Sequence, residues 1–328
     1  MNVLCGLANL GNTCYLNATL QILLCIDELN HYLLNIINIQ NLHQIHDSFL
    51  TKEWIQLFSF ILQHNNSTIS PNRFIEYSKE ISKRKNREEF SGFEQNDAND
   101  YFYFIIESFH NSLNKLDSNI KMPNSQYSFI NKYIEQIESK DSSIIPTLFQ
   151  SCLLYNYINL NDGNKEFHKI EHGYTIELSI PSKDNITIYD CFNETFKDDI
   201  LNEENAWFDE KTNTKKDVIK KTRLCYLPTI LSIHLKRWTY TLHKNNKFID
   251  IPINLDLKKF TIETNDDLTT YQLFGIINHM GNINGGHYTS YIRRNNRWFL
   301  IDDTQVIEVE ERNIIHSKNY CLFYRKIK

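Results

Sequence analysis

Near its start the chain carries the stretch Asn9-Leu-Gly-Asn-Thr-Cys14-Tyr-Leu-Asn17. Leucines follow at positions 16, 20, 23 and 24, and this helical spacing predicts a helix over residues 14–25. Cys14 therefore stands at the N-terminus of the first strongly patterned helix, where backbone N–H groups and the helix dipole favour a thiolate. A lone cysteine is more often a buried structural residue, so a catalytic interpretation needs a partner elsewhere in the chain.

A partner is available in the last third of the chain. Gly285 and Gly286 precede His287, which opens a strand pattern, and Asp302 ends the next strand pattern. Neighbouring antiparallel strands can bring such a histidine and carboxylate together. Cysteine as nucleophile, histidine as base and aspartate as the group that fixes the tautomer would then form one site. The residues alone leave two interpretations equally open: Cys14 is the nucleophile of a cysteine hydrolase, or it is a buried structural cysteine.

Length and composition bound the class of protein. The chain has 328 residues, of which 41% are hydrophobic and 23% charged, so it can form a sizeable core and is neither disordered nor a coiled coil. A net charge of −5 argues against a nucleic-acid partner. No apolar run approaches the ~18 residues of a membrane helix. Seven scattered cysteines, an odd number, indicate a reducing, intracellular compartment rather than a disulfide framework.

The order of the patterned segments predicts an α+β fold in which a helical lobe faces a sheet lobe. Helical patterns come first and cover Trp54–Leu62, Pro71–Ile81 and Asp97–Leu116. Residues 117–145 are polar and weakly patterned, and we expect a surface excursion there. Strand-like segments follow at 175–180, 229–235, 248–251, 271–278, 287–293, 298–301 and 320–325, interrupted by a helix over 188–201.

Four stretches of the sequence occur in the order found in one known family, and through them the chain resembles the ubiquitin-specific proteases, which are papain-like cysteine deubiquitinases. Gly6–Gln21 is similar to the cysteine box of the family, and Gln95–Phe102 is similar to its acidic box. Leu227–Trp238 and Tyr271–Asp303 resemble its later strand and histidine boxes. Because matching stretches spread over residues 4–325, the resemblance covers essentially the whole chain.

This resemblance implies a papain-like α+β fold, with a helical thumb lobe against an antiparallel-sheet palm that carries a fingers extension. We expect a single catalytic domain over residues 1–328, with the thumb at about 1–116 and the fingers and palm at about 146–328. The implied activity is thiol-dependent cleavage of the isopeptide or peptide bond after the C-terminal glycine of ubiquitin. The expected partners are ubiquitin and ubiquitinated proteins, without nucleic acid, membrane or cofactor. We expect a monomer in the cytoplasm or nucleus.

The catalytic roles of the family carry over onto residues that match its boxes. Cys14 would be the nucleophile, His287 the general base and acid, and Asp302 the carboxylate that orients the imidazole.

The oxyanion would also have a donor. Asn9, five residues before the cysteine, would donate its side-chain amide to the oxyanion. An asparagine there could instead cap the following turn, a role that suits Asn12 better. Asp303 would assist the oxyanion or a water molecule, or else be a solvated carboxylate at a strand end.

The implied binding residues for the ubiquitin tail are Asp97, Asp100, Gly285, Gly286 and Trp238. Asp97 and Asp100 lie three positions apart near a helix start, where they could pair with arginines of the tail or complement the helix dipole. The two glycines would leave room for a tail without side chains, and they also suit a turn. Trp238 stands where the family usually has phenylalanine and would form one wall of the tail channel.

Two alternatives to a ubiquitin hydrolase stay open. A catalytically silent ubiquitin-binding scaffold could share the fold, but the presence of Cys14, His287, Asp302 and Asn9 favours the enzyme. A protease for another ubiquitin-like modifier would use the same residues, because such modifiers can share a Gly-Gly tail.

Zinc is predicted to be absent from the purified protein. Many family members hold zinc with two Cys-x-x-Cys pairs, whereas residues 152–155 and 209–212 carry no such pair, and structural zinc needs four ligands. We expect elemental analysis to find no stoichiometric zinc and activity to persist in a chelator. A result of one zinc per chain would contradict this prediction and direct attention to Cys152, His168 and His172.

Overall fold

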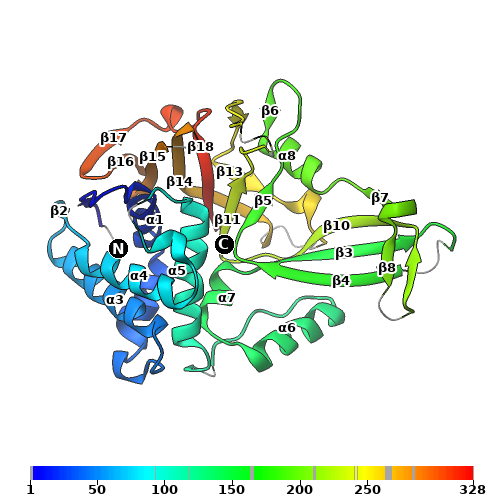
Figure 1. The fold of residues 1–328 in the computed structure, drawn as a ribbon, viewed down its shortest axis with the longest axis horizontal. Helices are drawn as coiled ribbons and strands as arrows, with labels where there is room; N and C mark the ends of the chain where they lie inside the picture. The colour runs from blue at the N-terminus through cyan, green and yellow to red at the C-terminus, as the bar shows by residue number, and fades with distance from the viewer. Residues whose placement is uncertain are drawn as a thin grey trace.

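The computed structural model shows an elongated molecule in which most helices gather at one end and a narrow sheet extends to the other (Figure 1). It describes residues 3–327 apart from residues 93, 118, 163–165, 210–211, 240, 242, 263–267 and 283–284. None of the helices in this described part combines the length and the apolar character that a bilayer crossing needs.

An eight-stranded sheet organises the second half of the chain. Its strands run in the order β17-β16-β15-β14-β18-β11-β5, and β13 pairs with β14 beside this path. These strands are β5 (Ile176–Leu178), β11 (Ile230–Leu235), β13 (Asn254–Asp256), β14 (Thr270–Asn282), β15 (Gly285–Arg294), β16 (Arg297–Asp302), β17 (Gln305–Val309) and β18 (Asn319–Lys326). All pairs are antiparallel except β11 with β5. Two short parallel pairs, β1 (Gly6–Leu7) with β2 (Thr68–Ile69) and β6 (Ile186–Thr187) with β12 (Ile249–Asp250), lie outside this sheet.

Helix α1 (Cys14–Leu24) lies at the centre of the helical end, and all of its residues are buried. The helices of this end of the molecule are α2 (Asp27–His31), the π-helical η1 (Tyr32–Ile36), α3 (Asp47–Gln63), α4 (Asn72–Arg84), α5 (Ala98–Leu113) and α7 (Ile144–Phe149). Helix α1 packs against α5 on one side and against β14, β15 and β16 on the other. One of its buried polar groups, the Gln21 amide, donates to the Cys5 carbonyl at 2.8 Å.

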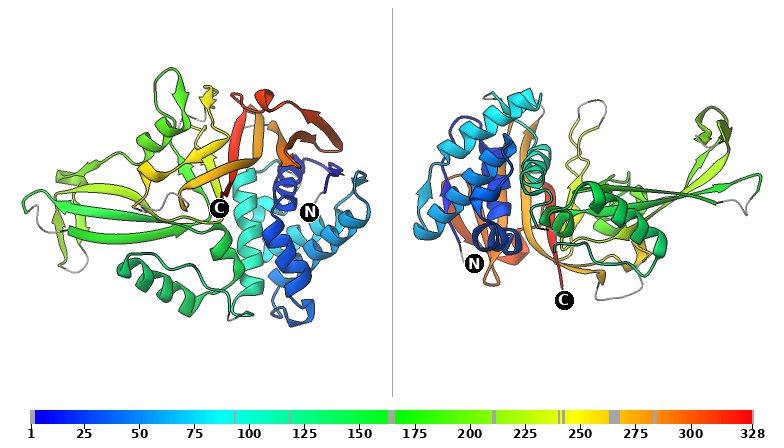
Figure 2. Two further views of the ribbon diagram at one scale, coloured as in Figure 1. Left: turned by 180° about the vertical axis from the view of Figure 1, so that it is seen from behind. Right: turned by 90° about the horizontal axis from the view of Figure 1, so that it is seen from below.

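A four-stranded sheet projects away from the helices (Figure 2). Its order is β4-β3-β10-β7. The strands are β3 (Ser151–Asn159), β4 (Glu166–Gly173), β7 (Asp199–Leu201) and β10 (Val218–Tyr226). Helix α6 (Ser128–Lys140) covers one face of this sheet, where Ile130 and Ile134 pack with Cys152 and Leu154. This small core is separate from the cores on either side of the larger sheet.

The structure confirms the helix expected over residues 14–25 as α1, but two other expectations are wrong. Residues 117–145, expected as a surface excursion, contain helix α6, of which only two residues are fully buried, too few to produce a clear helical pattern. The helix expected over 188–201 ends at Thr195. This helix, α8 (Ile188–Thr195), begins with a capping box formed by Thr187 and Asp190, and the chain then leaves it to pair as β7 with β10.

Strands β3, β4 and β10 were missing from the sequence-based expectation. Helix α6 covers one face of their sheet, while Tyr157, Phe167 and Trp207 stack on the other, so apolar residues point both ways and the alternation of a half-exposed strand is lost. Helix α4 begins at Asn72, one residue later than expected.

The hairpin of β8 (Trp207–Asp209) and β9 (Thr214–Lys216) lies at one of the two positions considered for zinc. Asp209 is only 2% exposed. Its carboxylate accepts a hydrogen bond from the Thr212 hydroxyl at 2.7 Å and forms an ion pair with the Lys216 ammonium. Side-chain bonds within the hairpin therefore link its two strands. Cys152, at the other position considered for zinc, lies near the start of β3 and is buried under α6.

Helix α1 packs closely against the sheet at Gly275 of β14. A Cβ atom at this position would lie 2.7 Å from Ile22 Cδ1 of helix α1. No side chain larger than hydrogen fits there unless the helix or the isoleucine moves.

Gly275→Ala is therefore expected to lower the free energy of unfolding by about 1–3 kcal/mol through overpacking. Ile22→Val removes the opposing Cδ1 methyl and should cost about 0.5–1.5 kcal/mol on its own. We expect urea denaturation to show that the double variant loses less stability than the sum of the single variants. Simple additivity would contradict the proposed contact.

Candidate active site

The loop before α1 is shaped by Asn9. Its side-chain oxygen accepts hydrogen bonds from the backbone N–H groups of Gly11 and Thr13, at 3.2 and 3.1 Å. Gly11 and Asn12 both have positive φ angles, 98° and 52°, which turn the chain into the helix. The sequence-based view that Asn12 suits the capping role better is therefore wrong, because Asn9 bonds to the turn. The N-cap residue Thr13 makes no capping hydrogen bond itself.

Cys14 is the first residue of α1 and is 1% exposed. Burial raises the pKa of its thiol above the usual value, the backbone N–H of Tyr288 lowers it, and the Asp303 carboxylate raises it further. The helix start was expected to favour a thiolate, and in the structure burial, the largest influence on this thiol, acts in the opposite direction. Tyr288 follows His287 in β15, so its N–H also brings the thiol next to the strand that carries the histidine.

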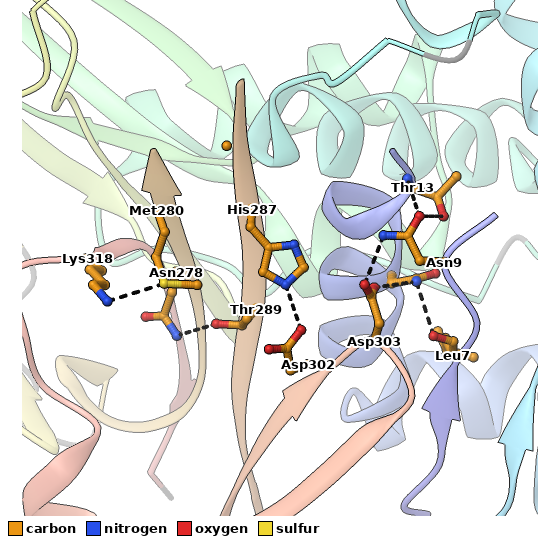
Figure 3. A network of polar contacts seen from close by, with 12 residues as sticks. Leu7, Asn9, Thr13, Asn278, Met280, His287, Thr289, Asp302, Asp303 and Lys318 are labelled. Atoms are coloured by element: carbon orange, nitrogen blue, oxygen red, sulfur yellow. Dashed lines mark hydrogen bonds and ion pairs between the residues drawn. The ribbon is translucent and has the colours of Figure 1, made fainter. Parts of the chain in front are cut away.

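His287 and Asp302 meet across the ends of β15 and β16. The imidazole Nε2 lies 2.6 Å from Asp302 Oδ1 (Figure 3), and both side chains are about one-third exposed, at 35% and 38%. The expectation that neighbouring strands would bring these two residues together is confirmed. In the described part of the chain, no hydrogen bond joins the imidazole to the Cys14 thiol, which is common in enzymes without bound substrate.

Asp303 ties the loop of Asn9 to the sheet. Its two carboxylate oxygens accept hydrogen bonds from the side-chain amides of Asn9 at 2.9 Å and Asn17 at 2.8 Å (Figure 3). Its carbonyl oxygen accepts from the Leu7 N–H at 2.8 Å. Asp303 is therefore not a merely solvated residue at a strand end. The role of Asn17 was missed in the sequence, where an asparagine on the helix face of Cys14 was the available signal.

A pocket of about 240 Å³ lies on the β14 side of His287. Its lining residues come from the loop before α5, from β14 and β15, and from the segment after β11: Gln95, Asn96, Asp97, Trp238, His279, Asn282 and Tyr288. The Gln95 side chain bonds to both backbone groups of Gly286, donating to its carbonyl and accepting from its N–H. Gln95 and His279 were not singled out in the sequence.

Trp238 is held in the wall of this pocket by its neighbours. The preceding Arg237 is fully buried and donates to the carbonyl oxygens of Asn319 at 2.7 Å and Asn245 at 2.9 Å. Lys244 lies over the Trp238 ring at 5.9 Å and donates to the His279 carbonyl at 2.6 Å. The indole therefore has a fixed position beside β14.

Asp97 and Asp100 occupy different environments, although both lie at the start of α5. Asp97 is the N-cap: one carboxylate oxygen accepts from the N–H groups of Asn99 at 2.7 Å and Asp100 at 3.2 Å, and the other accepts from the Tyr320 hydroxyl. Asp100 is exposed. Partial desolvation and the Asp97 charge raise the pKa of its carboxyl. The two aspartates lie near the helix start as expected, but Asp97 is used as its cap and Asp100 faces solvent.

Gly285 and Gly286 lie within β15, paired with Asn282 and Gly281 of β14, and not in a turn as the alternative interpretation expected. A Cβ atom on Gly286 would collide with the His279 imidazole and approach the Met280 carbonyl oxygen to 2.6 Å, whereas a Cβ on Gly285 would meet nothing within 4 Å. Of these two positions, packing therefore requires glycine at 286 but not at 285.

Among the described residues, one set of three side chains could share a metal ion, namely His287, Asp302 and Asp303, with ligand atoms within 4.8 Å of one another. Their atoms are already used, because Asp302 bonds to His287 and Asp303 accepts from Asn9 and Asn17. The bonding pattern fits an oriented imidazole better than a metal centre.

A helical layer packed on an antiparallel sheet, with a cysteine at the start of the first helix beside a histidine strand, is the papain-like α+β arrangement. The family model described as ubiquitin carboxyl-terminal hydrolase matches residues 5–324. The chain belongs to this family, in its ubiquitin-specific protease branch.

Comparison with known proteins supports this assignment. Ubiquitin carboxyl-terminal hydrolase 2 of Homo sapiens is 28% identical over 98% of this chain and 55% of its own length. Ubiquitin carboxyl-terminal hydrolase 4 of Saccharomyces cerevisiae is 27% identical over 98% of this chain and 39% of its own length. The chain thus spans about half or less of these relatives. The yeast SAGA DUB module, solved with ubiquitin aldehyde, contains a chain with the same fold, at a TM-score of 0.76, 22% identity and coverage of 99% of this chain and 70% of that one.

Asp97→Ala is expected to destabilise the fold by about 2–4 kcal/mol, because it removes a helix cap worth about 1 kcal/mol and leaves the Tyr320 hydroxyl without its acceptor at a cost of about 1–3 kcal/mol. Asp97→Asn can still cap and should recover part of the loss. Asp100→Ala, at an exposed position, should change stability by less than about 0.5 kcal/mol. Thermal and urea unfolding measure these effects. Equal losses for Asp97→Ala and Asp100→Ala would contradict the assignment.

The alkylation of Cys14 by iodoacetamide is expected to rise with pH to a midpoint above the ~8.5 of free cysteine, because burial and the Asp303 charge both disfavour the thiolate. Asp303→Asn removes that charge, so the midpoint should move to lower pH. Cys14→Ala serves as the control that the other six cysteines, all buried, do not react. A wild-type midpoint below that of free cysteine would contradict the prediction.

Proposed function

We propose that this protein is a thiol-dependent hydrolase that cleaves the isopeptide or peptide bond after the C-terminal glycine of ubiquitin. The observation that carries the proposal is the convergence of three segments at one site: the start of α1 with Cys14, the start of β15 with His287, and the end of β16 with Asp302. Membership of the ubiquitin carboxyl-terminal hydrolase family supports this reaction class.

In the proposed reaction, Cys14 Sγ attacks the carbonyl carbon of the terminal glycine while His287 accepts the thiol proton. Asp302 holds the imidazole through Nε2, which leaves Nδ1 for the proton transfer. When the tetrahedral intermediate collapses, the C–N bond breaks and His287 gives its proton to the departing lysine amine. Water then attacks the thioester with the help of His287, and the ubiquitin carboxylate is released as the thiol forms again.

The oxyanion of this reaction would be stabilised by the Asn9 side-chain amide and the Cys14 backbone N–H. One donor of this kind is typically worth about 2.7–4 kcal/mol in the transition state. Asp303 accepts one amide hydrogen of Asn9, which orients the amide, and the second hydrogen remains for the oxyanion. Asp303 and Asn17 would therefore act as positioning residues.

The tail of ubiquitin would enter through the pocket beside Trp238. We propose that Asp100, exposed at the start of α5, attracts an arginine of the tail, and that Asp97 acts indirectly by capping α5. Gly285, with open space around its α-carbon, would accommodate the tail backbone. In this proposal the helical end is the thumb, the larger sheet is the palm and the four-stranded sheet with α6 is the fingers of one catalytic domain.

We further propose that the enzyme acts as a monomer on ubiquitin and ubiquitinated proteins inside the cell. All seven cysteines are free and buried, which fits a reducing compartment. A silent scaffold and a protease for another ubiquitin-like modifier remain the competing functions, and the experiment below separates them.

A ubiquitin probe with a C-terminal electrophile is expected to label Cys14 alone, because Cys14 lies beside β15, whose His287 is paired with Asp302. The adduct is located by mass-spectrometric peptide mapping. The Cys14→Ala variant, which should not be labelled, serves as the control. An adduct on Cys5, Cys25 or Cys321 would contradict the proposed nucleophile. No adduct at all would favour the scaffold, and exclusive labelling by probes built on another modifier would favour that substrate.

A further inference from the structure

Strand β17 forms one outer edge of the eight-stranded sheet (Figure 1). Four of its five residues are exposed, and they include two apolar ones on opposite faces, Val306 at 37% and Ile307 at 46% exposure. A strand at the margin of a sheet normally buries at least one of its faces. Of the residues of β17, only Val309 at the end of the strand packs partly against a core within the part of the chain that the structure describes.

The free edge of β17 lacks the features that usually protect strand edges. Such edges commonly contain lysine, proline or a bulge, whereas β17 reads Gln-Val-Ile-Glu-Val and pairs with β16 without a break, from Gln305 opposite Asp302 to Val309 opposite Trp298. Extended peptides bind to open edges of this kind by adding a strand.

The position of β17 relates it to the candidate active site. Strand β17 follows Asp302 after a two-residue turn, so its free edge begins next to the candidate active site. In the sheet, β16 and β17 lie on one side of His287, whereas β14, which lines the tail pocket with His279 and Asn282, lies on the other side. A chain that enters through this pocket and is cut at Cys14 would continue on the side of β16 and β17.

The charge of this edge indicates what could bind there. Beyond Asp302 and Asp303 of the candidate site, residues 304–312 contain three acidic residues and one arginine. One of the three, Glu311, accepts a hydrogen bond from the Trp298 indole at 3.1 Å. Glu308 pairs with Arg297 at 3.0 Å and Glu310 with Arg312 at 2.5 Å, but all four side chains are more than half exposed. Exposed ion pairs of this kind are weak, so an incoming lysine or arginine can replace the present partner.

We propose that the free edge of β17 binds an extended, basic segment of the protein from which ubiquitin is removed, as an additional antiparallel or parallel strand. This inference rests on the proposed function, and it names the acceptor side of the same site. Backbone hydrogen bonds to β17 would provide the affinity, Val306 and Ile307 would contact alternate side chains, and the acidic residues would select a basic sequence.

The geometry sets the distance between the bound segment and the modified lysine. An added strand would lie three strand spacings from β15, about 14 Å, and an extended chain advances about 3.3 Å per residue. The basic segment therefore begins about four residues from the lysine that carries ubiquitin. A lysine with only one or two flanking residues cannot reach β17.

The test compares three substrates: ubiquitin aminomethylcoumarin, ubiquitin linked to a lysine with two flanking residues, and ubiquitin linked to a peptide with six basic and β-branched residues starting four positions from the lysine. Wild type should cleave the long conjugate with at least a tenfold higher kcat/KM than the short one. Glu308→Lys/Glu310→Lys should abolish this advantage and leave cleavage of the coumarin substrate within twofold.

Val306→Pro tests the edge itself, because the register turns the Val306 N–H away from β16 and proline removes this donor. It should lower kcat/KM for the long conjugate through KM, and circular dichroism and the coumarin substrate report whether the site stays intact. Should Val306→Pro unfold, the charge variants alone decide. Glu80→Lys is the matched control, since Glu80 forms a similarly exposed pair with Arg84 on helix α4, away from β17.

The outcomes separate this inference from the proposed function. If wild type cleaves none of the substrates, the proposed function fails. If it cleaves the coumarin substrate but treats both conjugates alike, or if Glu80→Lys has the same effect as the β17 variants, the inference is overturned. Sedimentation of the free protein completes the test, because a dimer that the β17 variants dissolve would mean that a second copy occupies this edge.

Discussion

The enclosure of helix α1 is the constraint on which the candidate site depends. No residue of α1 is exposed, and the helix lies between α5 and the strands that carry His287 and Asp302. Because a close-packed interior resists displacement, this packing fixes Cys14 relative to the sheet more firmly than any single polar contact could. Apolar side chains that take no part in chemistry thus set the distances between the groups that do.

Asp303 adds a polar link to this apolar packing. It joins α1 through Asn17, the preceding loop through Asn9, and β1 through its own carbonyl oxygen. The same carboxylate raises the pKa of the Cys14 thiol, so the residue that orders the loop also disfavours the thiolate. Asp303 therefore stabilises the loop before α1 but disfavours ionisation of the Cys14 thiol. Ionisation depends on His287 as the group that accepts the proton.

The sequence predicts the parts of this structure that are encoded locally. The helix of residues 14–25 has a clear period, and His287 and Asp302 lie at the ends of neighbouring strand patterns. The role of Asp97 could not be predicted, because its hydroxyl partner Tyr320 lies 223 positions away. The raised pKa of Cys14 could not be predicted either, since desolvation depends on tertiary packing, whereas the favourable helix dipole is visible in the sequence.

The contact between Gln95 and Gly286 has a consequence for selectivity. A side-chain amide here bonds to the backbone of a strand residue as a neighbouring strand would. A peptide main chain that binds along Gly286 must displace the Gln95 amide and make the same hydrogen bonds with its own amide group. The number of hydrogen bonds therefore hardly changes. The net free energy of such an exchange is small. Selectivity at this position therefore depends on shape. Bulky residues are excluded sterically, and a residue that fits gains little affinity from these hydrogen bonds.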